Sequence, residues 1–372
     1  MAGPLTAVRT PILIVLVAGA CASPPASAQV AIVDVGRYNF TGGSSDDPRL
    51  VAEELGGLSR VEGERYVSVG DDQAVLHFLD IAVDPQSGRV RSVAFGPPVP
   101  LRDAAGRELT DRRHASDRED VAVDARSGTV WIADERDAGD PRRPSLVEAD
   151  LASGRILRRL SPADGGPLAV YAAIRSNYGF ESVTRADSGT VMWIATEEAL
   201  EIDGPLASPE RGSVVRIQEI DDRLGPTRQL AYVTDPTEHA IASPRPAVGE
   251  DRSGVSALLA LDEGRLLVLE RALAGDAAGM AGFRIRIYLA ELDGATDVSV
   301  APFRDGLAAN PGWSPVRKTL LFERRFGLPV ANFEGMGLGP RLADGDRSLL
   351  LIADNGGGTW QSIYALKLRG LP

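Results

Sequence analysis

Residues 180–198 read FESVTRADSGTVMWIATEE, two short runs of apolar and β-branched residues on either side of a D-S-G turn. Runs of this length, bounded by Gly, Asp and Ser, are typical of β-strands joined in a hairpin. Glu181 stands at the start of the first run, and Glu197 and Glu198 close the second. The start of the first strand and the end of the second lie at the same end of an antiparallel hairpin, so these carboxylates are expected to lie together.

The same unit recurs along the chain. Five strands of the acid-ended kind are YVSVGDD (66–72), WIADE (131–135), WIATEE (193–198), LLVLER (266–271) and LLIADN (350–355). Their upstream partners are GLS (57–59), REDVAVD (118–124), FESVTRA (180–186), GVSALLALD (254–262) and FEGMGLGP (333–340). Successive acid-ended strands are about 60 to 85 residues apart, more than a minimal four-stranded blade needs. Repeats of this size built from hairpins predict radial repetition, an all-β propeller.

The two ends of the predicted domain are also strand-like. QVAIVDVG (29–36) and SIYALKL (362–368) would complete one blade if they paired, and that pairing would close the ring and hide its sheet edges. Five visible hairpins plus a closing unit predict six blades. We expect residues 29–372 to form this single domain, as a monomer.

The first 28 residues predict a secretion signal, with Arg9 followed by the apolar run PILIVLVAGA. That run of about ten residues is shorter than the roughly 20 needed to span a bilayer, so no transmembrane segment is expected. Two processing routes stay open: cleavage at the A-x-A site of residues 26–28, or a lipobox-like AGAC that would lipidate Cys21. The predicted location is periplasmic or extracellular, with a lipid anchor under the second route.

Composition excludes several function classes. Cys21 is the only cysteine, so the predicted domain has no disulfide, thiolate zinc site or cysteine nucleophile. The chain has 40 basic and 52 acidic residues, a formal net charge of −12, which argues against a nucleic-acid partner. An acidic surface suits a protein that uses divalent cations, although solubility alone explains most acidic surfaces.

The hairpins predict where the acids gather. If the hairpins are the inner strands of successive blades, their acidic ends meet at one mouth of the central channel. Carboxylates so close repel one another unless protons or cations neutralise them, and calcium accepts six to eight oxygen ligands in loose geometry. The predicted metal ligands are Asp71, Asp72, Glu119, Asp120, Glu135, Glu181, Glu197, Glu334 and Asp354. The alternative is that each acid is a solvated strand-end residue; the repeated Glu before an apolar strand, in FES and FEG, favours a calcium site.

These segments also carry a family resemblance. GLSRVEGERYVSVGDD, DREDVAVDARSGTVWIADE, NYGFESVTRADSGTVMWIATEEAL, GVSALLALDEGRLLVLERA and NFEGMGLGPRLADGDRSLLLIADNGGG resemble, in order and wording, the motifs of the bacterial phytase-like family called esterase-like activity of phytase. The resemblance runs from about Gly56 to Leu368. Three positions depart from the family pattern: Tyr178 replaces an Arg, Ala272 an Asp, and Asn355 a common second Asp. The departures bear on phosphate affinity and on the number of metals.

The resemblance implies a calcium-dependent hydrolase of phosphoester or ester bonds in a small-molecule substrate. Metal ions held by the carboxylates would bind substrate oxygens and activate a water. The candidate catalytic residues are Glu119, Glu181, Glu334 and Arg271. The candidate substrate-binding residues are Arg175, Arg271, Asn177 and Asn355, with Arg suited to bidentate phosphate binding and with a structural salt bridge as the alternative for each Arg.

Other chemistries are less well supported by the sequence. The chain has no G-x-S-x-G elbow, and its three histidines, His77, His114 and His239, show no zinc-binding spacing. Trp131 and Trp193 occupy equivalent repeat positions and are expected to pack between blades. A non-catalytic propeller that binds a ligand or partner at the cell surface stays open as an alternative, because fold does not imply function. A lactonase-type esterase with a single channel calcium is the third.

Overall fold

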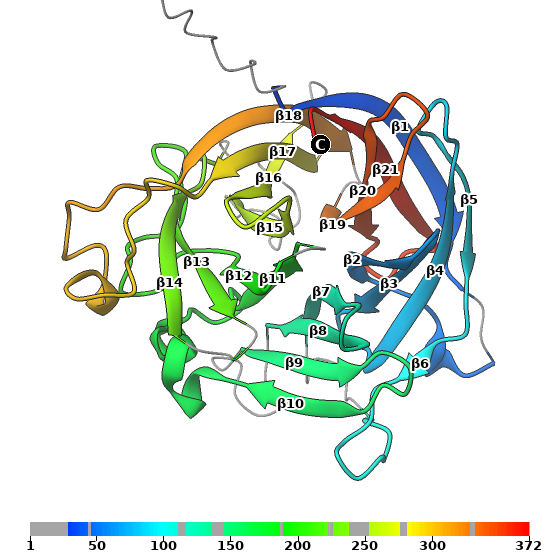
Figure 1. Ribbon diagram of the computed structural model, residues 1–372, viewed down its shortest axis with the longest axis horizontal. Coiled ribbons are helices and arrows are strands. Elements are labelled where there is room, and N and C mark those ends of the chain that lie inside the picture. Colours follow the sequence, from blue (N-terminus) through cyan, green and yellow to red (C-terminus); the bar gives the residue numbers. More distant parts are fainter. Residues whose placement is uncertain are drawn as a thin grey trace, which may run out of the picture.

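Five antiparallel sheets stand around a common axis in the computed structural model (Figure 1). The structure describes residues 29–43, 46–110, 117–135, 144–186, 189–221, 223, 226–237, 253–275, 281–327 and 332–371. The predicted β-propeller is confirmed, but the predicted number of six blades is wrong, because the strands form five.

The five blades follow one another along the chain and are numbered in that order. The strands of each blade are given from the innermost to the outermost. Blade 1 contains β2 (Leu55–Glu62), β3 (Arg65–Gly70), β4 (Val75–Val83) and β5 (Val90–Phe95), with the short β6 (Val99–Pro100) paired to β4. Blade 2 contains β7 (Arg118–Asp124), β8 (Thr129–Asp134), β9 (Ser145–Asp150) and β10 (Ile156–Leu160). Blade 3 contains β11 (Phe180–Arg185), β12 (Val191–Thr196), β13 (Val214–Asp221) and β14 (Pro226–Val233). Blade 4 contains β15 (Ser253–Ala260), β16 (Arg265–Gly275), β17 (Ala281–Glu291) and β18 (Arg317–Gly327).

Blade 5 closes the ring and explains why the predicted number of blades is one too many. It contains β19 (Asn332–Arg341), β20 (Arg347–Asp354), β21 (Trp360–Arg369) and, as its outermost strand, β1 (Ala31–Thr41) from the start of the chain. β1 pairs antiparallel with β21 from Ala31 opposite Arg369 to Thr41 opposite Trp360. The predicted pairing of the two ends is therefore confirmed. The pair completes the fifth blade and adds no sixth.

The five predicted hairpins are the inner halves of the five blades. β2, β7, β11, β15 and β19 each pair with the strand that follows, and neighbouring members of this set pack against one another around the axis. Short 3₁₀ segments lie in the connections: η1 (Pro48–Leu50), η2 (Pro162–Asp164), η3 (Gly166–Ala173) and η5 (Phe303–Asp305). Within the described residues, no helix is long and apolar enough to cross a membrane. The predicted signal, with Cys21, lies outside the described residues.

Apolar side chains fill the spaces between neighbouring blades. Trp193 packs between blades 3 and 4 with Tyr232 and Val268, and Trp131 packs between blades 2 and 3 with Phe180. Both tryptophans are buried, at 0% and 5% exposure, as the prediction of blade packing requires. Burial of whole aromatic rings is a large stabilising contribution in a domain that has no disulfide. The blades are therefore held as one ring by these layers.

Each innermost strand changes register near its start. In β7, β11 and β19 a β-bulge leaves one residue without a partner opposite, and in all three it is a glutamate: Glu119, Glu181 and Glu334. β15 has Ser256 at the corresponding place, and β2 is also shifted there. A β-bulge bends the strand and re-aims the side chain of the extra residue. The three bulges therefore decide where these glutamates point.

Candidate functional site

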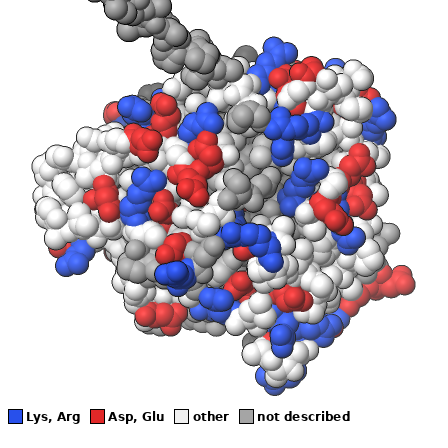
Figure 2. Space-filling view, viewed as in Figure 1, with Lys and Arg blue, Asp and Glu red and all other residues white. Residues whose placement is uncertain are grey.

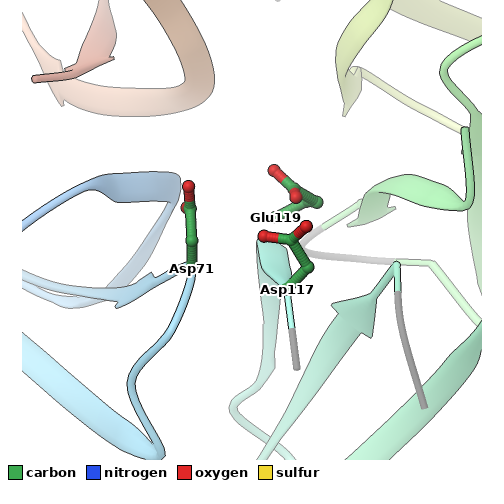
Figure 3. Close-up of side chains that lie close together, drawn as sticks. All are labelled: Asp71, Asp117 and Glu119. Atoms are coloured by element: carbon green, nitrogen blue, oxygen red, sulfur yellow. The ribbon is translucent and has the colours of Figure 1, made fainter. Parts of the chain in front are cut away.

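The first acidic group consists of Asp71, Asp117 and Glu119. Asp71 follows β3, Asp117 directly precedes β7, and Glu119 is the bulge residue of β7. One carboxylate oxygen from each of the three lies within 4.8 Å of the other two. Figure 3 shows the Asp71 side chain of blade 1 beside Asp117 and Glu119 of blade 2. Two adjacent blades thus present three carboxylates to one point.

The second acidic group consists of Glu135, Glu181 and Glu197. Their carboxylate oxygens also lie within 4.8 Å of one another, and all three residues are buried. Glu135 and Glu197 follow the second strands of blades 2 and 3, whereas Glu181 is the bulge residue of β11. The hairpin geometry predicted this meeting of strand starts and strand ends.

Two glycines allow the second group to approach the neighbouring blades. A Cβ on Gly179 would lie 2.5 Å from Cγ of Glu135, and a Cβ on Gly254 would lie 2.5 Å from Cγ of Glu197. The Gly179 amide also donates a 2.8 Å hydrogen bond to Glu135 Oε1. Any side chain at these positions would displace a carboxylate, so the glycines help to set the site.

The two groups form one electrostatic unit, which we call the acidic mouth. Burial first, and then the negative charges of Glu181 and Asp71, raise the pKa of Glu119 well above its usual value. Burial and the charge of Glu197 raise the pKa of Glu181, which Arg271 partly opposes. Burial, followed by the charges of Asp354 and Asp117, raises the pKa of Asp71. Without a cation, the site therefore favours protonated carboxyl groups.

Arg271 in β16 lies among the acids of the second half of the mouth. Its Nη2 is 2.8 Å from Glu197 Oε1 and 3.9 Å from Glu181 Oε1. Its Nη1 pairs with Glu334 and donates a 2.6 Å hydrogen bond to Asn332 Oδ1. Glu119, Glu181, Glu334 and Arg271, the four predicted catalytic residues, are therefore brought to one end of the axis.

Some predicted metal ligands lie apart from the two groups. The Asp120 carboxylate accepts hydrogen bonds from the backbone amides of Val121, at 2.8 Å, and Val183, at 3.1 Å. This buried side chain thus ties β7 to β11. Asp72 lines a separate cavity of about 510 Å³ beside blade 1. Asp354 accepts a 2.9 Å hydrogen bond from Asn332 Nδ2, and its negative charge acts on Asp71.

The predicted substrate-binding residues are not gathered around Arg271. Arg175 donates hydrogen bonds to the carbonyl oxygens of Ala199, at 3.1 Å, and Gly204, at 2.8 Å, and so holds a connection of blade 3. Asn355 Oδ1 accepts a 3.0 Å hydrogen bond from the Glu54 amide. Asn177 lies in the connection before β11 with φ 63°, a left-handed conformation that Asn tolerates. Arg175 and Asn355 have contacts typical of structural residues.

Sequence reasoning missed Asp117 and Asn332. Each stands two residues before a bulge glutamate, Asp117 before Glu119 and Asn332 before Glu334. Asn332 Nδ2 donates 2.9 Å hydrogen bonds to both Glu334 and Asp354, so it orders this side of the mouth. Alternation along a strand puts residues two apart on one face, and that period could have found both residues.

Among the histidines, only His77 lies within the described residues, and it takes no part in the acidic mouth. His77 is buried in β4, where its Nε2 lies 2.7 Å from Gln73 Oε1. His114 and His239 lie outside the described residues.

On the face of the molecule drawn in Figure 2, basic and acidic side chains are interspersed over the blades. The described chemistry of the site is therefore that of carboxylates and one arginine.

The acidic mouth offers what a hard cation such as calcium binds. Asp71 Oδ1 is buried without a hydrogen-bond partner. Glu119 is 8% exposed, and none of the hydrogen bonds or ion pairs found for the described residues involves its carboxylate. Calcium takes its ligands from such oxygen donors, with carboxylates foremost. The donor set of the first acidic group therefore fits a calcium ion.

Comparisons with known proteins identify the family. Among solved structures, the PQQ-bound aldose sugar dehydrogenase of Streptomyces coelicolor is 13% identical, with a TM-score of 0.38 over 93% of this chain and 100% of that one. A DUF4221 family member from Bacteroides vulgatus is 10% identical, with a TM-score of 0.39 over 92% and 99%. No curated protein matches the sequence. The family model that matches residues 53–357 is the phytase-like one described as esterase-like activity of phytase, and the chain belongs to that family.

Proposed function

We propose that the protein is an exported, calcium-supported hydrolase that cleaves a phosphoester or ester bond at the acidic mouth. The observation that carries the proposal is the first acidic group, whose carboxylate oxygens lie close together. In this group, neither the buried Glu119 carboxylate nor Asp71 Oδ1 has a hydrogen-bond donor among the described residues. Membership of the phytase-like family supports hydrolysis as the reaction class. The predicted signal in residues 1–28 supports export to the periplasm or beyond the cell.

Each part of the mouth has a task in this proposal. Asp71, Asp117 and Glu119 would hold the cation, which supplies Lewis acidity toward a substrate oxygen and toward water. Glu181, whose pKa is raised by burial, holds a proton at higher pH than an exposed glutamate does and can pass it to a leaving group. Arg271 and Asn332 keep Glu334 in place.

A second candidate is hydrolysis of an uncharged ester or lactone. The contacts of Arg271 and Arg175 favour it. Arg271 is occupied by Glu197, Glu334 and Asn332, and Arg175 by carbonyl oxygens. A phosphomonoester brings charge that needs cationic partners, whereas a lactone does not. If neither substrate class reacts, the remaining alternative is a propeller that binds a ligand or partner without catalysis.

The test is a hydrolysis assay of the mature chain on phosphomonoesters, carboxylic esters and lactones, with calcium or with a chelator. We expect calcium-dependent turnover of at least one class. Glu119→Gln should lower it on the order of a hundredfold or more, because it removes a carboxylate of the first group. Glu62→Gln, at the far end of β2, is the matched control and should leave turnover unchanged. If calcium binds and no class reacts, the hydrolase proposal fails and the binding alternative replaces it.

The two processing routes are tested separately. Expression of the full chain with Cys21→Ser should release the protein from the membrane fraction if the lipid route is used, and change nothing if cleavage at residues 26–28 is used. Mass spectrometry of the mature N-terminus distinguishes the two. Retention of the intact chain in the cytoplasm would contradict export.

A further inference from the structure

The two halves of the acidic mouth are neutralised differently. In the first acidic group, the charges that act most strongly on Glu119 are the negative ones of Glu181, Asp71, Asp117 and Glu135. The charge of Arg271 also acts on Glu119, but without an ion pair among the described residues. In the second group the cation Arg271 reaches Glu197 and Glu181 directly. One half of the mouth therefore has a built-in positive charge, and none of the ion pairs of the described residues brings one to Glu119.

Arg271 is fixed in its place on several sides. Its Nη2 contacts Glu197, its Nη1 contacts Glu334 and Asn332, and its guanidinium carbon lies 5.6 Å from the centre of the Phe283 ring. The side chain is only 14% exposed. In blade 4 the bulge residue is Ser256, where blades 2, 3 and 5 have a glutamate.

All three members of the second group have partners within the chain. Glu135 accepts a hydrogen bond from the Gly179 amide, and Glu197 and Glu181 face Arg271 Nη2 through their Oε1 atoms. A calcium ion bound to those Oε1 atoms would lie 2.3–2.6 Å from them and so close to the guanidinium. Like charges at such separation repel strongly in a buried site.

We infer that the acidic mouth binds one divalent cation, at Asp71, Asp117 and Glu119, and that Arg271 is a built-in counter-ion in place of a second cation. The inference rests on the proposed function for the presence of the cation. It assigns Arg271 a positioning role: Arg271 is the counter-ion of Glu197 and Glu334 and holds these two carboxylates apart from the cation.

The test is calorimetric titration of the metal-free mature chain with calcium chloride. The wild type should bind one ion per chain. Glu119→Gln should weaken binding on the order of a hundredfold, whereas Glu197→Gln, a matched change in the other half, should change the dissociation constant by no more than about threefold. Arg271→Met should add a second ion, and Arg271→Lys, which keeps the charge, should still bind one.

Folding of each variant is checked by thermal unfolding followed by circular dichroism. If the Arg271→Met variant does not fold, the comparison of Glu119→Gln with Glu197→Gln still shows in which half of the acidic mouth calcium binds. Two ions in the wild type, or equal losses from the two glutamine variants, would overturn the inference while leaving a calcium-dependent hydrolase intact. A folded wild type that binds no calcium would overturn both proposals.

Discussion

Glu119 and Asp120 are adjacent in sequence and lie in different surroundings. A β-bulge in β7 turns Glu119 into the acidic mouth, whereas the next side chain accepts backbone hydrogen bonds from Val121 and Val183. Both carboxyl groups are buried, and burial is the first cause of the raised pKa of each. Residue type and sequence position therefore do not separate a carboxylate of the acidic mouth from one that ties two strands together, and both were predicted as ligands.

Replacement of Asp120 by asparagine distinguishes the two roles. The amide group would turn a donor toward one of the two backbone amides, so a buried N–H would lose its acceptor. We expect Asp120→Asn to lower the free energy of unfolding in urea by about 1–3 kcal/mol and to leave calcium affinity unchanged. Lost calcium affinity at unchanged stability would instead make Asp120 a ligand.

His77 predicts acid sensitivity of the fold. Burial lowers its pKa from 6.5 to about 4, so the unfolded chain binds a proton below pH 6.5 and the folded chain does not until near pH 4. The neutral His77 therefore makes its full contribution to the free energy of unfolding above pH 6.5, and this contribution is lost as the pH falls from 6.5 toward 4. Between pH 7 and pH 5, His77 should lower the free energy of unfolding by about 2 kcal/mol.

Urea unfolding of the wild type and of His77→Gln at both pH values measures this effect. Glutamine can still reach Gln73 and has no proton to gain, so the variant should lose about 2 kcal/mol less than the wild type between the two pH values. An identical pH dependence in both proteins would show that His77 is protonated in the folded chain.

At the scale of elements, the hairpins could be read from the sequence and the bulges could not. Runs bounded by turn residues located all five inner hairpins, because strand length and turn chemistry are local properties. A bulge adds one residue without changing the apolar pattern around it, so the sequence does not show where a bulge lies. The directions in which the Glu181 and Glu334 side chains point therefore could not be predicted, because they depend on how the blades pack. Arg175 and Asn355 lie next to acidic motifs in the sequence, but their side chains contact a carbonyl and an amide group of nearby connections.

The closing strand β1 gives a prediction at the same scale. Removal of residues 29–41 takes away the outer partner of β21 along its whole length, and also the buried Val30 side chain, while the pairing of β21 with β20 remains. We expect the melting temperature of the remaining chain to fall on the order of 10 °C, or cooperative folding to be lost. The mature chain that begins at residue 29 is the control. A truncated chain with an unchanged melting temperature would show that the closure contributes nothing to stability.

At the scale of the whole molecule, one cation held by two blades should stabilise the entire ring. A ligand that binds only the folded chain adds about 2.7 kcal/mol at a hundred times its dissociation constant. Calcium should therefore raise the melting temperature of the chelator-treated protein, and Glu119→Gln should not respond. A calcium response retained in Glu119→Gln would place the stabilising ion elsewhere.

The fold class and the closure of the ring were predictable because each blade repeats the same local pattern. The number of blades was not, because the sequence does not show whether the terminal strands extend an existing sheet or begin another. The pairing of β1 with β21 settles that question in favour of extension. The acidic mouth was predictable in outline for the same reason: hairpin ends meet wherever hairpins are arranged radially.

The closure also has a consequence for biosynthesis. β1 is synthesised before the strands of all the other blades, whereas its partner β21 is synthesised after them. β1 therefore has no neighbour to pair with until the strands of all five blades have been made. A nascent chain therefore cannot close its ring before the last blade has been synthesised, so the final step of folding follows synthesis of β21.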